Sequence, residues 1–154
     1  IDHLMGIKGK RSVDSIHKEL GHIMWEHVGM ARTKEGLEEG LKLMKNLRKE
    51  FETNLFVPGS KDGLNVELDK AFRLNDFITM GELIAWDALN RNESCGGHFR
   101  EEYQTEDGEA KRDDQNCFYV SCWEYQGSDD KAPVMYKEPL KYEAIEVKTR
   151  NYKN

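Results

Sequence analysis

The side chains best suited to chemistry lie in one polar segment, residues 92–114, with the sequence NESCGGHFREEYQTEDGEAKRDD. A cysteine, a histidine and two arginines occur there, and residues 93–114 carry eight acidic and three basic side chains. Residues of these types bind metal ions, transfer protons or contact charged partners. The segment could therefore be a catalytic loop, a metal site or a solvated surface.

The spacing within this segment argues against a self-contained catalytic site. A calcium loop needs acidic ligands at alternate positions around a central glycine, and EDGEAKRDD lacks that spacing. Ser94 and His98 lie four residues apart in a bend, without the glycine-flanked elbow of a serine nucleophile. A dinucleotide fingerprint G-x-G-x-x-G is also missing, because GIKGKR at residues 6–11 follows no strand. A metal site that uses Cys95 and His98 stays open as an alternative.

The remaining histidines and cysteines do not form a metal-binding pattern. His17, His22 and His27 recur every five residues, so a helix would distribute them around its axis. The chain has three cysteines, an odd number without a C-x-x-C pair. This favours a reducing compartment over a disulfide framework.

Composition limits the class of protein further. The chain has 154 residues, enough for one domain, with a formal net charge of -6 and a pI near 5.4. This charge argues against nucleic acid as a partner, since phosphate binding needs clustered Lys and Arg. No apolar run reaches the ~18 residues of a membrane span. The chain begins at Ile1 without a leader pattern, so we expect a piece of a longer protein.

Two glycines define how the polar segment is presented. Gly96 and Gly97 free the backbone where a long helical pattern ends, and we expect them to project His98, Phe99 and Arg100 away from the helices. A bulky apolar side chain between two potential cations suits an interface anchor. The alternative, equally open, is that these residues cap the helix and pack against strands.

Three helices are predicted to position this bend. Ser12 begins the first, which Gly29 ends, and Thr33 begins the second, at residues 33–54. Each has one apolar stripe at helical spacing: Val13, Ile16, Leu20, Ile23 and His27 in the first, and Leu37, Leu41, Met44, Leu47, Phe51 and Leu55 in the second. The third, at about residues 64–92, is apolar on more than one side. That surplus indicates either a docking surface or a cover from the last third of the chain.

The last third of the chain changes character. Residues 116–125, 134–140 and 143–149 are short and rich in aromatic and β-branched side chains, so we expect two or three strands. The predicted fold is mainly α: an antiparallel three-helix bundle followed by a small C-terminal β extension. We assign residues 1–93 to the bundle and residues 94–154 to an acidic loop and β extension packed on it, as one structural domain.

Long strings of this sequence resemble a known family. RSVDSIHKELGHIMWEHVGMART and ELIAWDALNRNESCGGHFREEYQTEDGEAKRDD are similar to the C-terminal domain of the flavoprotein subunit of succinate dehydrogenase and fumarate reductase, in a bacterial branch. The family bend reads Glu-Ser-Arg-Gly-Ala-His, followed by Arg and later by Arg-Asp-Asp. The matching residues here are Glu93, Ser94, Gly96, His98, Arg100, Arg112, Asp113 and Asp114. Cys95 stands where the family usually has arginine.

The resemblance implies a spectrin-like bundle appended to an FAD-binding body that interconverts succinate and fumarate in respiratory electron transport. The residues that bind flavin and substrate in that family lie upstream, and none corresponds to a residue here. We therefore expect no catalytic, cofactor-binding or metal residues in this chain, and FAD only in the parent protein. The resemblance assigns domain or subunit docking to His98, Phe99, Arg100, Arg112 and Asp113.

The same resemblance implies partners and a location. The partners would be the upstream FAD-binding and capping domains, the iron–sulfur subunit and, indirectly, a membrane quinone-binding subunit. The parent complex would be peripheral on the cytoplasmic face of the inner membrane. Two alternatives remain: the similar C-terminal domain of L-aspartate oxidase, and a free-standing helical interaction module whose third helix binds a partner helix.

Overall fold

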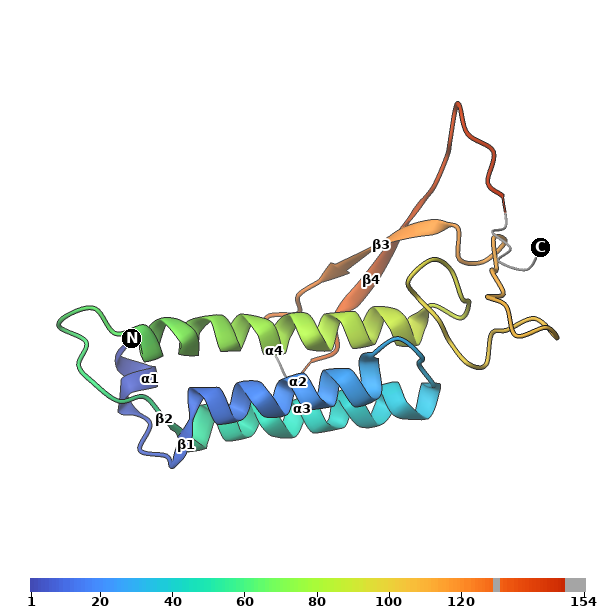
Figure 1. The fold of residues 1–154 in the computed structure, drawn as a ribbon. Coiled ribbons are helices and arrows are strands. Elements are labelled where there is room, and N and C mark those ends of the chain that lie inside the picture. The colour runs from blue at the N-terminus through green and yellow to red at the C-terminus, as the bar shows by residue number, and fades with distance from the viewer. Residues whose placement is uncertain (129–130, 149–154) are drawn as a thin grey trace. The chain divides into compact units, whose positions relative to one another are not determined.

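Three long helices make up most of the first part of the chain in a computed structural model, which describes residues 1–128 and 131–148. They are α2 (Val13–Val28), α3 (Lys34–Asn54) and α4 (Val66–Asn90). In Figure 1, α2 and α4 run in one direction and α3 runs in the opposite one. The predicted antiparallel bundle is confirmed, and its third helix is slightly shorter at both ends than the sequence pattern indicates.

Side-chain caps explain where these helices begin. The Ser12 hydroxyl accepts a hydrogen bond from the Ser15 amide at 3.2 Å, and the Thr33 hydroxyl accepts one from the Gly36 amide at 3.0 Å. Before α4, the Asn65 side chain accepts from the Leu68 amide at 3.1 Å. Because the first amides of a helix have no partner within it, each cap stabilises its helix by about 1 kcal/mol.

The apolar stripes of the helices meet in one core. The buried hydrophobic residues of the three helices are Val13, Ile16, Leu20, Ile23, Val28, Leu37, Met44, Leu47, Phe51, Leu68, Ala71, Leu74, Ile78, Ala85 and Ala88. Gly81 of α4 faces both neighbours, since a Cβ there would lie 3.0 Å from the Met24 sulfur and 3.1 Å from the Met44 sulfur. The three helices therefore approach one another closely at this glycine. Of the predicted stripes, His27 and Leu41 are only half-buried.

A buried ion pair joins α3 to α4. The Arg48 guanidinium lies 2.7 Å from a Glu82 carboxylate oxygen and donates to the Thr79 hydroxyl at 3.1 Å. Arg48 is buried and Glu82 is mostly shielded from solvent. A charged pair in such surroundings favours one register of the two helices, because a shift would leave a charge without its partner.

Short elements that the sequence did not predict lie at the end of the bundle where α2 begins and α3 ends. Helix α1 (Asp2–Gly6) precedes strand β1 (Arg11–Ser12), which pairs in parallel with β2 (Leu55–Phe56). Gly9 lies against the Asn54 backbone, where a Cβ would come within 1.9 Å of the carbonyl group. Two-residue strands carry no hydrophobic period, so only the folded chain reveals them.

The last third contains a two-stranded antiparallel sheet. Strand β3 (Tyr119–Glu124) pairs with β4 (Val134–Pro139), with Cys122 opposite Tyr136. These are two of the predicted strands. Residues 143–148 form no strand, and residue 149 lies outside the described residues. Residues 143–148 are all exposed, so their β-branched side chains have no buried face to pack on.

The chain divides into two compact units, Ile1–Leu89 and Asn90–Asn154, which are described separately below. The organisation into one structural domain with a boundary after residue 93 remains a prediction.

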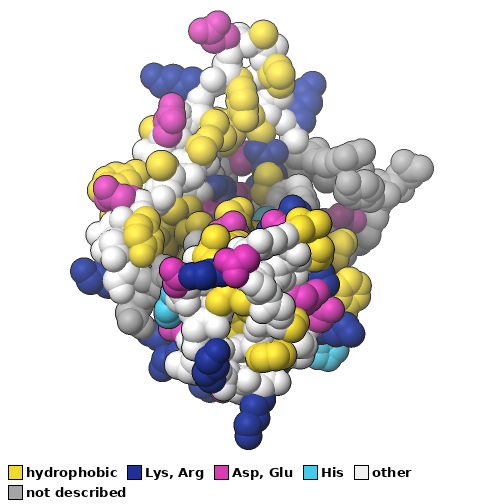
Figure 2. Space-filling model, turned by 90° about the vertical axis from the view of Figure 1, so that its left-hand side faces the viewer, with side chains coloured by type: hydrophobic (Ala, Val, Ile, Leu, Met, Phe, Trp, Pro, Cys, Tyr) yellow, Lys and Arg dark blue, Asp and Glu magenta, His cyan; other side chains and the backbone are white. Residues whose placement is uncertain are grey.

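Apolar side chains also lie at the surface, between acidic and basic ones, on the face shown in Figure 2. None of the helices in the described residues combines the length and apolarity needed to cross a bilayer.

Candidate functional site

The Gly-Gly bend is a tight hairpin in the second unit. The Cys95 amide donates to the His98 carbonyl at 2.8 Å, and the His98 amide donates back to the Cys95 carbonyl at 3.0 Å. Gly96 has a φ of 59°, in the left-handed region that side chains with a Cβ rarely adopt. The backbone therefore reverses within two residues, as the glycine pair predicts.

Ser94 and Arg100 close the base of this hairpin. The Ser94 hydroxyl accepts a hydrogen bond from the Arg100 amide at 2.8 Å and donates to the Arg100 carbonyl at 3.1 Å. The Ser94 amide donates to the Lys111 carbonyl at 2.8 Å, which joins the bend to the later part of the acidic loop. Since Ser94 is fully buried, these bonds compete with no water, and they hold residues 94–100 as one loop.

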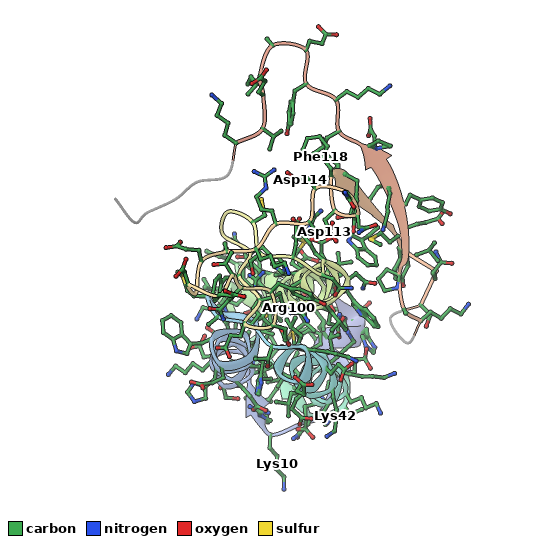
Figure 3. The ribbon with its side chains drawn as sticks, turned by 90° about the vertical axis from the view of Figure 1, so that its right-hand side faces the viewer. Lys10, Lys42, Arg100, Asp113, Asp114 and Phe118 are labelled. Atoms are coloured by element: carbon green, nitrogen blue, oxygen red, sulfur yellow. The ribbon has the colours of Figure 1, made fainter. Side chains whose placement is uncertain are left out.

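The Arg100 side chain is enclosed rather than projected into solvent. It is 2% exposed, its Nε donates to a Glu102 carboxylate oxygen at 3.0 Å, and its guanidinium lies 5.4 Å from the centre of the Tyr103 ring. Figure 3 shows Arg100 among neighbouring side chains. A charge this deep requires such partners, because an unpaired one would cost several kcal/mol.

Glu93 connects two separate parts of the segment. One carboxylate oxygen lies 3.0 Å from Arg91 Nη1, and the other accepts the Asp113 amide at 3.0 Å. The Glu93 side chain is 4% exposed and that of Arg91 is 19% exposed, so the pair is largely desolvated. Glu93 therefore attaches the Asp113 turn to the residues just after α4.

Arg91 extends this network to the sheet. It donates to the Cys117 carbonyl at 2.9 Å and to the Tyr119 carbonyl at 3.2 Å. Its guanidinium lies 4.9 Å from the centre of the Tyr119 ring, and the Lys137 ammonium lies 4.3 Å from that centre. Two cations on one aromatic ring stabilise its position, since the ring face carries partial negative charge.

His98 and Phe99 directly follow the two glycines of the bend. His98 Nε2 is 3.0 Å from the Arg91 carbonyl oxygen, and since a carbonyl only accepts, Nε2 carries a proton and donates it. Both side chains are partly buried, with a face left to solvent. The bond to Arg91 fixes the imidazole at the end of the hairpin.

The Arg112–Asp114 region forms a second charged group. Arg112 donates to Asp114 through Nη2 at 2.6 Å and Nε at 3.0 Å, and this bond raises the pKa of Arg112. The Asp113 carboxylate accepts from the Asn116 side chain at 2.9 Å and from the Asn116 amide at 3.2 Å. These bonds lower the pKa of the Asp113 carboxyl. Asp113 and Asp114 are labelled in Figure 3, which shows that they follow one another in the loop.

The hydrogen bonds and ion pairs of this segment hold the loop at residues 94–114 in place. Across residues 1–128 and 131–148, every buried side-chain nitrogen and oxygen has a hydrogen-bond partner, and no group of three His, Cys, Asp or Glu side chains could hold a metal ion. Cys95, Cys117 and Cys122 are free thiols, and burial raises the pKa of Cys117. The charged side chains thus bond to one another and shape the surface that His98 and Phe99 present.

Two residues central to this network carried no predicted role. Arg91 and Tyr119 join the bend to the sheet, and neither belongs to the set assigned to docking. An available signal was the pair Arg91 and Glu93, two opposite charges directly after an apolar helix. Tyr119 carried no such signal, because its ring meets Arg91 and Lys137 only after the strands pair.

Comparison with known proteins identifies the class. The family described as fumarate reductase flavoprotein C-term matches residues 17–152. The fumarate reductase flavoprotein subunit of Helicobacter pylori is 28% identical over 144 residues, which are 94% of this chain and 19% of that protein. L-aspartate oxidase 2-b of Nicotiana tabacum is 34% identical over 89 residues, 57% of this chain and 13% of that protein.

The fold is also found in solved structures. A quinol-fumarate reductase with menaquinol molecules superposes with a TM-score of 0.76 at 23% identity, over 93% of this chain and 24% of that chain. The described fold and the family match agree, and the chain belongs to the C-terminal family of fumarate reductase and succinate dehydrogenase flavoproteins. It spans about a fifth of the length of the curated relatives it matches.

Proposed function

We propose that this chain is the C-terminal helical domain of an FAD-containing flavoprotein subunit that interconverts succinate and fumarate. The match of residues 17–152 to the flavoprotein C-terminal family carries the proposal. The similarity to the Helicobacter pylori subunit over 94% of the chain supports the same parent protein. The parent would serve as an oxidoreductase in respiratory electron transport.

Within that parent, the role of this chain is structural. Its residues do not fit a flavin site, because the sequence has no G-x-G-x-x-G turn between a strand and a helix. The arginines of the bend are bonded to carboxylates of the same loop, Arg100 to Glu102 and Arg112 to Asp114. We expect the purified chain to be colourless and inactive with fumarate and succinate. Yellow protein with stoichiometric flavin would refute this role.

The bend is the part that docks onto the flavin-binding body. Phe99 and Arg112 keep exposed surface and would make direct contacts, while Arg100 is buried and would act by holding the loop. His98, bonded to the Arg91 carbonyl, sets the end of the hairpin, and Asp113 sets the turn that carries Arg112. Docking in this way would close the flavin body against solvent.

The test uses the full-length flavoprotein, with variants His98→Ala and Arg100→Ala and a control, Glu101→Ala, at an exposed carboxylate of the same loop. Limited proteolysis measures docking, and fumarate affinity measures the active site. We expect the first two variants to be cleaved faster with little change in fumarate affinity, and the control to match the native protein. Unchanged cleavage together with a large loss of fumarate binding would place these residues at the substrate instead.

The proposed partners follow from the same family. They are the FAD-binding and capping domains of the same chain, an iron–sulfur subunit and, indirectly, a quinone-binding membrane subunit, with the complex peripheral on the cytoplasmic face of the inner membrane. Resemblance to a solved quinol-fumarate reductase supports membership of such a complex. Purification of the tagged flavoprotein from membranes should recover an iron–sulfur protein, detected by its electron paramagnetic resonance signal.

A second candidate is the C-terminal domain of an L-aspartate oxidase. The identity of 34% over 89 residues to the tobacco enzyme favours it, although the match covers less of this chain. Assays of the full-length protein separate the two. Oxidation of L-aspartate by the purified protein would support this candidate, and succinate–fumarate interconversion without it would exclude it.

A further inference from the structure

Helices α2 and α4 share an exposed apolar surface that the bend does not use. It consists of Trp25 on α2 and Phe77, Met80 and Ile84 on α4, and we call it the α2–α4 face. Trp25 is 77% exposed and Met80 is 54% exposed, while Phe77 and Ile84 are each more than two-fifths exposed. Side chains of this size are seldom left in water together on one helix pair, so the surface is a candidate interface.

Contacts between the helices place these residues on one surface. The His17 and Phe77 rings stack with centroids 5.4 Å apart, and Gly81 lies against Met24 and Leu20. Gly21 lies on α2 between the levels of His17 and Trp25, and a Cβ added there would meet nothing within 4 Å. The face thus has an open position at Gly21 with aromatic side chains on either side, which a side chain of a partner could fill.

At the level of the His17 and Phe77 rings, the two edges of this face carry opposite charges. On the α2 edge Lys18 directly follows His17, and on the α4 edge Asp76 directly precedes Phe77, so the stacked rings put both charges at one level of the bundle. Both side chains are exposed. Within the described part of the chain, neither has an ion-pair partner.

We propose that a second copy of this chain binds the α2–α4 face. A twofold axis parallel to the helices would lay α2 of one copy on α4 of the other, which brings Lys18 opposite Asp76 twice. The same operation buries Trp25 against Met80 and Ile84 of the other copy. A self-complementary charge pattern around an apolar centre is what an isologous dimer requires.

Sedimentation equilibrium of the full-length flavoprotein tests the dimer, with Met80→Asp as the disrupting variant. Met30→Asp is the control, because Met30 is even more exposed but lies after the end of α2. We expect a dimer for the native protein and for the control. The Met80→Asp variant should dimerise with an affinity at least about 100-fold weaker. A native chain that is monomeric at every concentration, or equal dimers for both variants, would overturn the proposal and leave the face to another partner.

Charge reversal gives a second measurement that does not depend on burying a carboxylate. Lys18→Glu and Asp76→Lys should each weaken self-association by about tenfold, because each places like charges together twice. Mixing the two variants should restore association as a heterodimer, since both contacts then join opposite charges. Native mass spectrometry resolves the species. A statistical mixture without heterodimer preference would contradict the proposed pairing.

Discussion

Removal of the Glu93 carboxylate should loosen the bend as a unit. The Glu93→Ala variant leaves the Asp113 amide without its acceptor and takes the carboxylate from Arg91, in a site where the Glu93 side chain is 4% exposed. Breaking a fully buried ion pair costs roughly 3–5 kcal/mol. Arg91 keeps the Cys117 and Tyr119 carbonyls as acceptors, so the expected loss is smaller, about 2–3 kcal/mol.

Amide hydrogen exchange measures this loss where it occurs. The reporting amides are those of Ser94, Cys95 and His98, which are bonded within the segment. A loss of about 2–3 kcal/mol lowers their protection by roughly 30- to 150-fold, since 1.36 kcal/mol corresponds to tenfold. Glu101→Ala is the control, because that carboxylate is exposed. Protection in Glu93→Ala equal to that of the control would show that Glu93 does not hold the bend.

Three further outcomes follow from the same structure. Gly96→Ala should destabilise the hairpin by about 1 kcal/mol, because Gly96 has a φ of 59°. Gly97→Ala should destabilise it less, because the added Cβ would meet open space. Hydrogen exchange of the His98 amide compares the two variants. Arg48→Ala should lower the free energy of unfolding by about 2–4 kcal/mol in urea, because Glu82 loses its partner. The pKa of Asp113 is lowered by folding, so its stabilising effect is present above its ordinary pKa of 3.8 and is lost as pH falls below it. Asp113→Asn removes the titrating carboxyl. The part of the acid-induced loss of amide-exchange protection that this carboxyl causes should then be absent.

Helix positions and the family were accessible from the sequence because they depend on local patterns. Ser12 and Thr33 cap helices since their hydroxyls reach amides three residues away, whatever the rest of the chain does. The apolar period predicts the buried stripes for the same reason. Long matching strings identify the flavoprotein family, and the Gly-Gly pair predicts the bend.

Contacts between distant residues were decided only by the tertiary structure. The Arg48–Glu82 pair, the approach of Met24 and Met44 at Gly81, and the two cations on Tyr119 each join residues far apart in the sequence. The enclosure of Arg100 was not predicted either, although its partners Glu102 and Tyr103 are close to it in the sequence. Local patterns specify which elements form, because capping and periodicity act within a few residues. Which side chains become buried or exposed depends on how those elements pack, and packing is a property of the whole fold.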